Sequence, residues 1–231
     1  MKQTFIKKEN NSRLILFFAG WGSDENLFGR ESKDGYDYMV CFDYRNLDFD
    51  FSLIDGYEEI YVLSWSMGVW AANNVLSRHE AEGLGIIKTI AVNGTVTPID
   101  DSRGIPADIF KGTLDNFSER TLAKFRRRIC GNTENTKEFL SHSPYRSLDS
   151  LRDELASLWD MASSTKAEGE GLKWDFAIVC LSDKIFPPEN QISAWTEYGK
   201  AVIMKTDAEH YSPELFNELL LELDNSKIFT E

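Results

Sequence analysis

The chain has 231 residues, of which 42% are hydrophobic and 13% aromatic; this composition excludes a disordered chain and predicts one large domain with a packed core. The formal net charge of −13 argues against binding to nucleic acid or to an anionic membrane, so we expect neither as a partner. Cys41, Cys130 and Cys180 are far apart and predict neither a disulfide framework nor a zinc site. With no secretory signal and no apolar run near the roughly 20 residues that span a bilayer, the sequence predicts a soluble, cytoplasmic protein.

Short, nearly continuous apolar runs define the predicted strands. They cover residues 14–18, 39–42, 60–63, 86–92, 176–181 and 201–204. Such runs are typical of strands buried on both faces, as in a parallel sheet covered by helices. Helical patterns lie between or after them, at 67–78, 188–198 and 213–223. The alternation predicts an α/β fold with a doubly wound, mostly parallel sheet.

The stretch from about residue 98 to 171 departs from this alternation. It contains no convincing strand and is rich in charged residues and helix formers. We expect a helical insertion that packs over the sheet as a lid within a single domain spanning 1–231. Residues 163–171, SSTKAEGEG, form the expected flexible return to the sheet. A separate helical domain is the alternative.

The most informative segment is IYVLSWSMGVWAA, residues 60–72, in which a predicted strand runs directly into a helix. A serine on such a turn is exposed at the top of the sheet, beside the positive end of the helix. The familiar pattern is G-x-S-x-G; here Ser64 replaces the first glycine and Gly68 is retained. We expect Ser66 to be the nucleophile rather than Ser64. The alternative is that Ser66 is only a helix cap.

A glycine-rich loop follows the first apolar run, in FFAGWGSD at residues 17–24. Hydrolases of the α/β class take one oxyanion donor from a loop at this place and the other from the residue after the nucleophile. The backbone N–H groups of Trp21 and Met67 are therefore the predicted oxyanion hole. An ordinary glycine-rich turn is the alternative for the loop.

The chain has three histidines, and only His210 follows a predicted strand, directly before the last helix. There it can reach over the sheet to Ser66 as general base. We expect His79 to be a solvated residue at a helix end and His142 to lie on the surface or in the lid.

Asp183 follows the penultimate strand and can orient the histidine; a simple turn aspartate is the alternative. Asp207 competes for this role but is close to His210 in sequence. The order Ser66, Asp183, His210 is that of α/β-hydrolases. Metal-ligand spacings and dinucleotide or phosphate-loop motifs are lacking, so we expect no cofactor and no metal.

The segments LILFFAGWGSD, VLSWSMGVWAA, LSDKIFPP and AEHY together resemble the BioG-type pimeloyl-[acyl-carrier protein] methyl ester esterases of biotin synthesis. The resemblance implies a serine carboxylesterase that cleaves the methyl ester of pimeloyl-carrier protein through an acyl-enzyme. It implies Ser66 as nucleophile, His210 as base, Asp183 as orienting acid, and Trp21 and Met67 as oxyanion donors.

A carrier protein is acidic, so its docking requires a local positive surface on this acidic chain. The predicted lid supplies one in Arg120, Lys124, Arg126, Arg127 and Arg128. All but Arg126 fall at helical spacings that place them on one face. A solvated helix face with internal salt bridges is the alternative for this cluster.

The alternative functions are a general short-chain carboxylesterase or thioesterase, a hydrolase-fold protein that binds an acyl carrier without catalysis, and a cofactor-free lyase. We expect a monomer.

Overall fold

The computed structural model describes residues 1–28, 33–78, 83–164 and 171–225. Its centre is a seven-stranded sheet in the order β1-β3-β2-β4-β5-β6-β7. The strands are β1 (Lys2–Lys7), β2 (Arg13–Phe18), β3 (Asp37–Phe42), β4 (Glu59–Trp65), β5 (Ile86–Val92), β6 (Phe176–Cys180) and β7 (Val202–Thr206). All neighbouring strands run parallel except β1, which pairs antiparallel with β3. The predicted doubly wound, mostly parallel sheet is confirmed.

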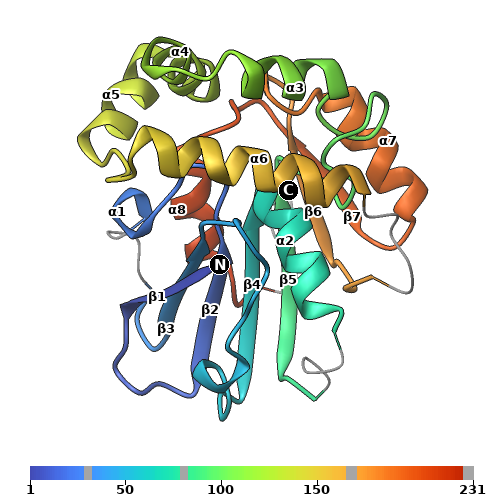
Figure 1. Cartoon of the computed structure of the whole chain (residues 1–231). Coiled ribbons are helices and arrows are strands. Elements are labelled where there is room, and N and C mark those ends of the chain that lie inside the picture. Colours follow the sequence, from blue (N-terminus) through green and yellow to red (C-terminus); the bar gives the residue numbers. More distant parts are fainter. Residues whose placement is uncertain (29–32, 79–82, 165–170, 226–231) are drawn as a thin grey trace.

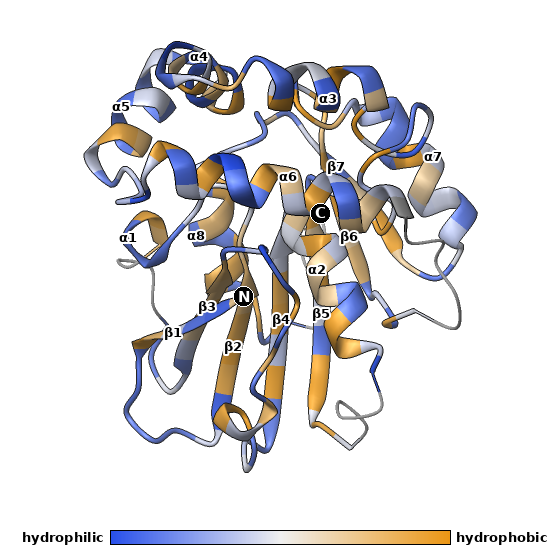
Figure 2. Ribbon diagram, viewed as in Figure 1, coloured by the Kyte–Doolittle hydropathy of each residue, from blue (hydrophilic) through white to orange (hydrophobic). Residues whose placement is uncertain are grey.

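The middle strands are buried on both faces, which explains their continuous apolar sequences. Every residue of β3 is buried, as are all but the first residues of β2 and β4. Figure 2 shows these strands as the most hydrophobic part of the ribbon, with hydrophilic residues concentrated in the loops at their ends. The sequence did not predict β1, because its residues are mostly polar and are at most partly buried.

The helices that follow strands pack along the sheet. They are α1 (Glu25–Phe28), α2 (Met67–Leu76), α7 (Pro188–Tyr198) and α8 (Pro213–Leu221), with a short 3-10 helix at Phe51–Leu53. The predicted helices 67–78, 188–198 and 213–223 correspond to α2, α7 and α8. No helix within the described residues is long and apolar enough to cross a bilayer.

The insertion between β5 and β6 contains four helices. They are α3 (Ala107–Asp115), α4 (Glu119–Cys130), α5 (Thr133–Ser141) and α6 (Leu148–Ser164). Figure 1 shows α3, α4 and α5 gathered above one end of the sheet, with the long helix α6 crossing between them and the strands. This is the end at which β4 turns into α2, so the insertion covers the turn that carries Ser66. The description of the insertion as a lid of a single domain stays a prediction.

Candidate active site

Ser66 lies at the sharp turn between β4 and α2. Its backbone has φ 59° and ψ −127°, a conformation that few residues other than glycine adopt. Gly68 is required one residue into the helix, because a Cβ there would lie 2.1 Å from the carbonyl oxygen of Phe18. The turn therefore presses α2 against the end of β2 and presents the Ser66 side chain at the edge of the sheet.

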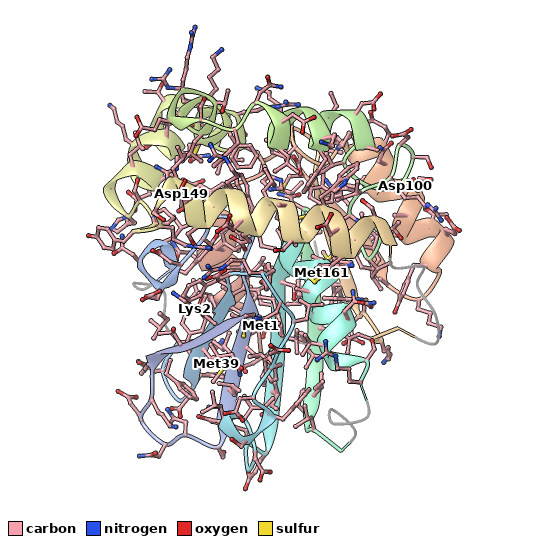
Figure 3. All side chains as sticks on the ribbon, in the orientation of Figure 1. Met1, Lys2, Met39, Asp100, Asp149 and Met161 are labelled. Carbon is pink, nitrogen blue, oxygen red and sulfur yellow. The ribbon has the colours of Figure 1, made fainter. Side chains whose placement is uncertain are left out.

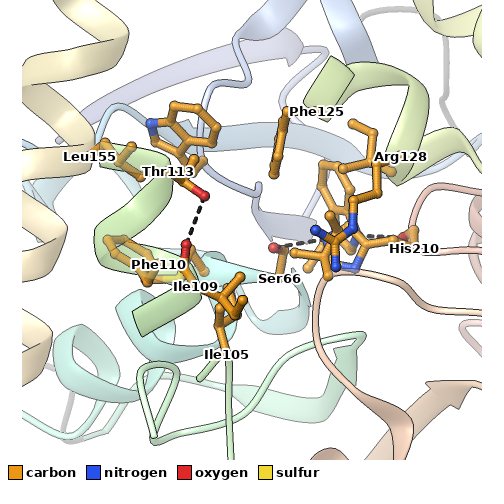
Figure 4. Close-up of a pocket in the computed structure, with 14 residues that line it drawn as sticks. Ser66, Ile105, Ile109, Phe110, Thr113, Phe125, Arg128, Leu155 and His210 are labelled. Carbon is orange, nitrogen blue, oxygen red and sulfur yellow. Dashed lines mark hydrogen bonds between the residues drawn. The ribbon is translucent and has the colours of Figure 1, made fainter. Parts of the chain in front are cut away.

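His210 and Asp183 reach Ser66 from the loops after β7 and β6. His210 Nε2 lies 3.0 Å from Ser66 Oγ, and His210 Nδ1 lies 2.8 Å from Asp183 Oδ2. The three residues are 2–6% exposed. Figure 4 shows the Ser66–His210 contact beside the pocket. An imidazole held between a hydroxyl and a carboxylate in this way can take the hydroxyl proton while the carboxylate stabilises the imidazolium.

Asp183 is fixed by further hydrogen bonds. Its Oδ1 accepts the backbone N–H groups of Ile185 and Phe186, at 2.7 and 3.0 Å. Its Oδ2 accepts an N–H from the Gln191 side chain at 3.0 Å, beside the bond to His210. Each carboxylate oxygen thus accepts two hydrogen bonds, and these fix the orientation of the carboxylate toward His210.

The backbone of His210 is also held in place. Its carbonyl accepts the indole N–H of Trp65 at 2.8 Å and the side-chain amide of Asn93 at 3.0 Å. Trp65 directly precedes Ser66, so one hydrogen bond ties the turn of the serine to the loop of the histidine. Phe186 lies parallel to the imidazole, with ring centroids 6.0 Å apart.

Trp21 and Met67 both line the pocket beside Ser66. Met67 is the first residue of α2, and Trp21 lies in the turn after β2. Within the described part of the chain, neither backbone N–H donates a hydrogen bond, so both are open to an acceptor in the pocket. The Trp21 indole N–H instead donates to the Leu151 carbonyl on α6, at 3.1 Å.

The pocket over Ser66 is mainly apolar and has an empty volume of about 630 Å³, including the part open to solvent. Side chains of the insertion form much of its wall: Ile105, Ile109, Phe110, Phe125, Ile129 and Leu155. Figure 4 shows Ile109 and Phe110 on one side of Ser66 and Phe125 on another. The polar lining beyond Ser66 and His210 comes from Thr113 and Arg128. This environment suits an apolar acyl chain whose carbonyl lies at Ser66.

The other candidates from the sequence lie elsewhere. Ser64 is fully buried in β4, and its Oγ has no hydrogen-bond partner within the described residues. His142 is buried at the end of α5, where its Nδ1 contacts Ser141 and Glu138. Asp207 accepts a hydrogen bond from Ser182 rather than from the histidine. His79 lies outside the described residues.

The basic residues of α4 divide between two faces. Arg120, Lys124, Arg127 and Arg128 are exposed. Figure 3 shows nitrogen-tipped side chains projecting outward from this helix. Arg126 is half-buried on the opposite face and lines a small cavity beside Trp21.

Gln191, Asn93 and the indole of Trp65 were not anticipated from the sequence. Asn93 follows the end of β5, as Ser66 and Asp183 follow the ends of β4 and β6, so its position was a usable signal. Gln191 lies inside a regular helix, and nothing in its local sequence distinguishes it from a surface glutamine.

Comparisons with known proteins identify the family of the chain. The family model described as pimeloyl-ACP methyl esterase BioG matches residues 1–219. A malonyl-[acyl-carrier protein] O-methyltransferase of Bacteroides fragilis is 44% identical over 214 residues. The match covers 93% of this chain but 42% of that protein, so this chain spans less than half the length of that relative.

Solved structures give the same family and the wider fold. The crystal structure of BioG from Haemophilus influenzae has a TM-score of 0.83 and 38% identity, covering 94% of this chain and 97% of that one. An esterase from Exiguobacterium antarcticum has a TM-score of 0.69 at 16% identity, covering 95% and 93% of the two chains, which supports the α/β-hydrolase fold alone. The chain belongs to the BioG family of α/β-hydrolases.

Proposed function

We propose that this protein is a serine carboxylesterase that hydrolyses the methyl ester of pimeloyl-[acyl-carrier protein] in biotin synthesis. The observation that carries the proposal is the continuous series of hydrogen bonds from Asp183 through His210 to Ser66, beside an apolar pocket, in a chain of the BioG family. Ser66 is the proposed nucleophile, His210 the general base and Asp183 the orienting acid.

The proposed reaction has two halves. Ser66 Oγ attacks the methyl ester carbonyl while its proton passes to His210 Nε2, and the C–OCH₃ bond breaks as His210 returns that proton to the leaving methanol. Water then attacks the acyl-enzyme, gives a proton to His210, and the Ser66 oxygen leaves with it. The N–H groups of Trp21 and Met67 are the proposed donors to the oxyanion in both halves.

The pocket accounts for the proposed choice of acyl group. Its apolar wall, from α3, α4 and α6, suits the methylene chain of a pimeloyl group, which gains free energy by leaving water. The bound pimeloyl group determines which of its two carbonyls reaches Ser66. The thioester at its other end is then too far from Ser66 to be attacked.

The exposed face of α4 is the proposed docking surface for the acidic carrier protein. Arg120, Lys124, Arg127 and Arg128 lie on this face, and within the described residues none of them forms an ion pair. Arg128 also lines the pocket, so the same face that would hold the carrier borders the entrance for its acyl chain. We further propose a monomer, since Ser66, His210 and Asp183 of a single chain complete the site without a residue from a second chain. The three buried free thiols support a cytoplasmic location.

The test is hydrolysis of pimeloyl-carrier protein methyl ester and of p-nitrophenyl acetate by the wild type, Ser66→Ala and Arg127→Glu. We expect a much higher kcat/KM on the carrier-linked ester, and loss of both activities in Ser66→Ala. Arg127→Glu should raise KM for the carrier-linked ester by about 3–10-fold and leave p-nitrophenyl acetate unaffected.

Lys205→Glu is the matched charge reversal, at an exposed position on the edge strand β7. It should leave both substrates unaffected. Activity confined to p-nitrophenyl acetate would leave a general carboxylesterase, and the absence of any Ser66-dependent hydrolysis would contradict the proposal.

A further inference from the structure

Glu154 is a fully buried carboxylate that the proposed reaction does not use. It lies on α6, 0% exposed, and burial raises its pKa above the usual value. Its ion pair is Arg146, whose Nη1 lies 2.6 Å from Oε2 and whose side chain is 5% exposed. Replacing such a buried pair with apolar side chains is often neutral or stabilising, so stability alone is a poor explanation for a charge at this position.

The hydrogen bonds of Glu154 lead to the loop that carries Trp21. Oε2 accepts the backbone N–H of Gly22 at 3.4 Å, and Oε1 accepts the backbone N–H of Tyr44 at 2.9 Å. The Tyr44 hydroxyl in turn lies 2.7 Å from the carbonyl oxygen of Ala19 and 3.0 Å from that of Cys41, and Ala19 is the nearer acceptor for its proton. Glu154 therefore holds the loop on both sides of Trp21: directly at Gly22, and through Tyr44 at Ala19.

Other groups near the start of α6 hold the same loop. The Trp21 indole donates to the Leu151 carbonyl, one helical turn before Glu154. Arg146 reaches the carbonyl of Ser23 at 3.4 Å while pairing with Glu154. In Figure 3, Asp149 lies near the start of α6 and Met161 in its second half. Gly22 has φ +78°, so the chain turns sharply directly after Trp21 and its path depends on these anchors.

We propose that Glu154 is a positioning residue that sets the direction of the Trp21 backbone N–H toward the oxyanion. The inference rests on the proposed serine-hydrolase chemistry at Ser66. A backbone donor stabilises an oxyanion only when the peptide is already aimed at the place where charge develops. The Trp21 N–H belongs to the Gly20–Trp21 peptide, and the hydrogen bonds at the Ala19 carbonyl and the Gly22 N–H hold the two peptides that flank it. Helix α6 thus holds the loop that carries Trp21 in place beside Ser66.

The test compares Glu154→Gln with the wild type. Glutamine has the same shape but only one acceptor oxygen, so its amide nitrogen must face a backbone N–H or Arg146. We expect kcat on p-nitrophenyl acetate to fall by about 10–100-fold with KM changed less than about 3-fold. An alkyl trifluoromethyl ketone adds to Ser66 Oγ to give a tetrahedral alkoxide, the serine proton passing to His210. Its affinity should fall in parallel with kcat.

Two further variants separate positioning from loss of stability. Tyr44→Phe removes the hydroxyl that reaches the carbonyls of Ala19 and Cys41, and should lower kcat and inhibitor affinity in the same direction but less. Lys88→Met removes a buried cation that donates to the carbonyl of Leu223, at the end of β5 away from the site. It should lower the melting temperature and leave kcat and inhibitor affinity within about 2-fold of the wild type.

The inference is overturned if folded Glu154→Gln and Tyr44→Phe keep wild-type kcat, or if kcat falls while inhibitor affinity is unchanged. Failure of the proposed function has a different signature. In that case the wild type would hydrolyse p-nitrophenyl acetate but not the carrier-linked ester. The comparison of variants on p-nitrophenyl acetate would still decide the role of Glu154.

Discussion

Asp183→Asn isolates the part of the site that controls the histidine. The introduced asparagine could keep its oxygen on the N–H groups of Ile185 and Phe186, so its amide nitrogen would take the place of Oδ2. That nitrogen would donate to His210 Nδ1, which leaves the proton on Nε2 and pointing at Ser66 Oγ. The histidine would then hold the wrong tautomer to accept the serine proton.

The magnitude follows from the loss of the general base while the pocket and the oxyanion donors remain. In Ser-His-Asp hydrolases the equivalent replacement lowers kcat by about 10⁴-fold, which corresponds to roughly 5.5 kcal/mol of transition-state stabilisation. Gln191 Nε2 donates to both Asp183 Oδ2 and the Phe186 carbonyl, so the new amide nitrogen loses one of these contacts and the variant should also lose about 1–3 kcal/mol of stability. We therefore expect a folded protein with kcat reduced by about 10³–10⁴-fold and KM little changed.

The assay is steady-state hydrolysis of p-nitrophenyl acetate and of the carrier-linked ester, with thermal unfolding measured on the same samples. Gln191→Met is the matched control, because it removes the neighbouring donor to Oδ2 and leaves the carboxylate itself. It should reduce kcat by about 10-fold or less. A decrease below about 10-fold in Asp183→Asn would refute the assignment of Asp183 as the residue that sets the tautomer of His210.

Two substitutions and one alkylation experiment test the fold. Gly68→Ala places a Cβ 2.1 Å from the Phe18 carbonyl oxygen, so it should destabilise the protein by about 1–3 kcal/mol in urea titration and reduce fluorophosphonate labelling of the serine. The Arg103 guanidinium holds the pKa of Asp100 at about 2, below its ordinary 3.8, so this pair stabilises the protein above about pH 4 and the contribution is lost as pH falls through 2. Asp100→Asn should therefore cost about 1 kcal/mol at pH 7 after solvent screening, and little at pH 2, in chemical denaturation at both pH values. Burial raises the pKa of the Cys180 thiol to about 12, so this thiol should resist alkylation at pH 8 in the native protein and react when urea unfolds it; rapid native alkylation would contradict its burial.

The sheet could be predicted because most of its strands are buried on both faces. Continuous apolar runs indicate such strands directly, and the loops at their carboxyl ends were therefore the places to search for polar residues. Ser66, Asp183 and His210 each follow such a run, and the structure brings them within hydrogen-bond distance. The antiparallel strand β1 lacked this signal because most of its residues are polar and none of them is fully buried.

The supporting residues could not be predicted in the same way. Gln191 and Glu154 lie in amphipathic helices, where an isolated polar residue is expected to face solvent. Each is fully buried because its helix packs against distant parts of the chain. Glu154 and Gly22, for example, are more than 100 residues apart in the sequence and form a hydrogen bond. Arg126 is different, because helical spacing already separated it from the other basic residues of α4, and the structure places it half-buried on the other face.

The identity of the covalent intermediate shows which carbonyl of the substrate Ser66 attacks. Attack of Ser66 on the methyl ester carbonyl leaves the whole carrier protein bound to the enzyme through the pimeloyl chain, whereas attack on the thioester leaves only a methyl pimeloyl group. Rapid acid quenching followed by intact-mass analysis distinguishes the two adducts. We expect an enzyme–carrier conjugate attached at Ser66, with release of methanol, and no such conjugate in Ser66→Ala. An adduct carrying the methyl pimeloyl group alone, or methanol release by Ser66→Ala at the wild-type rate, would contradict it.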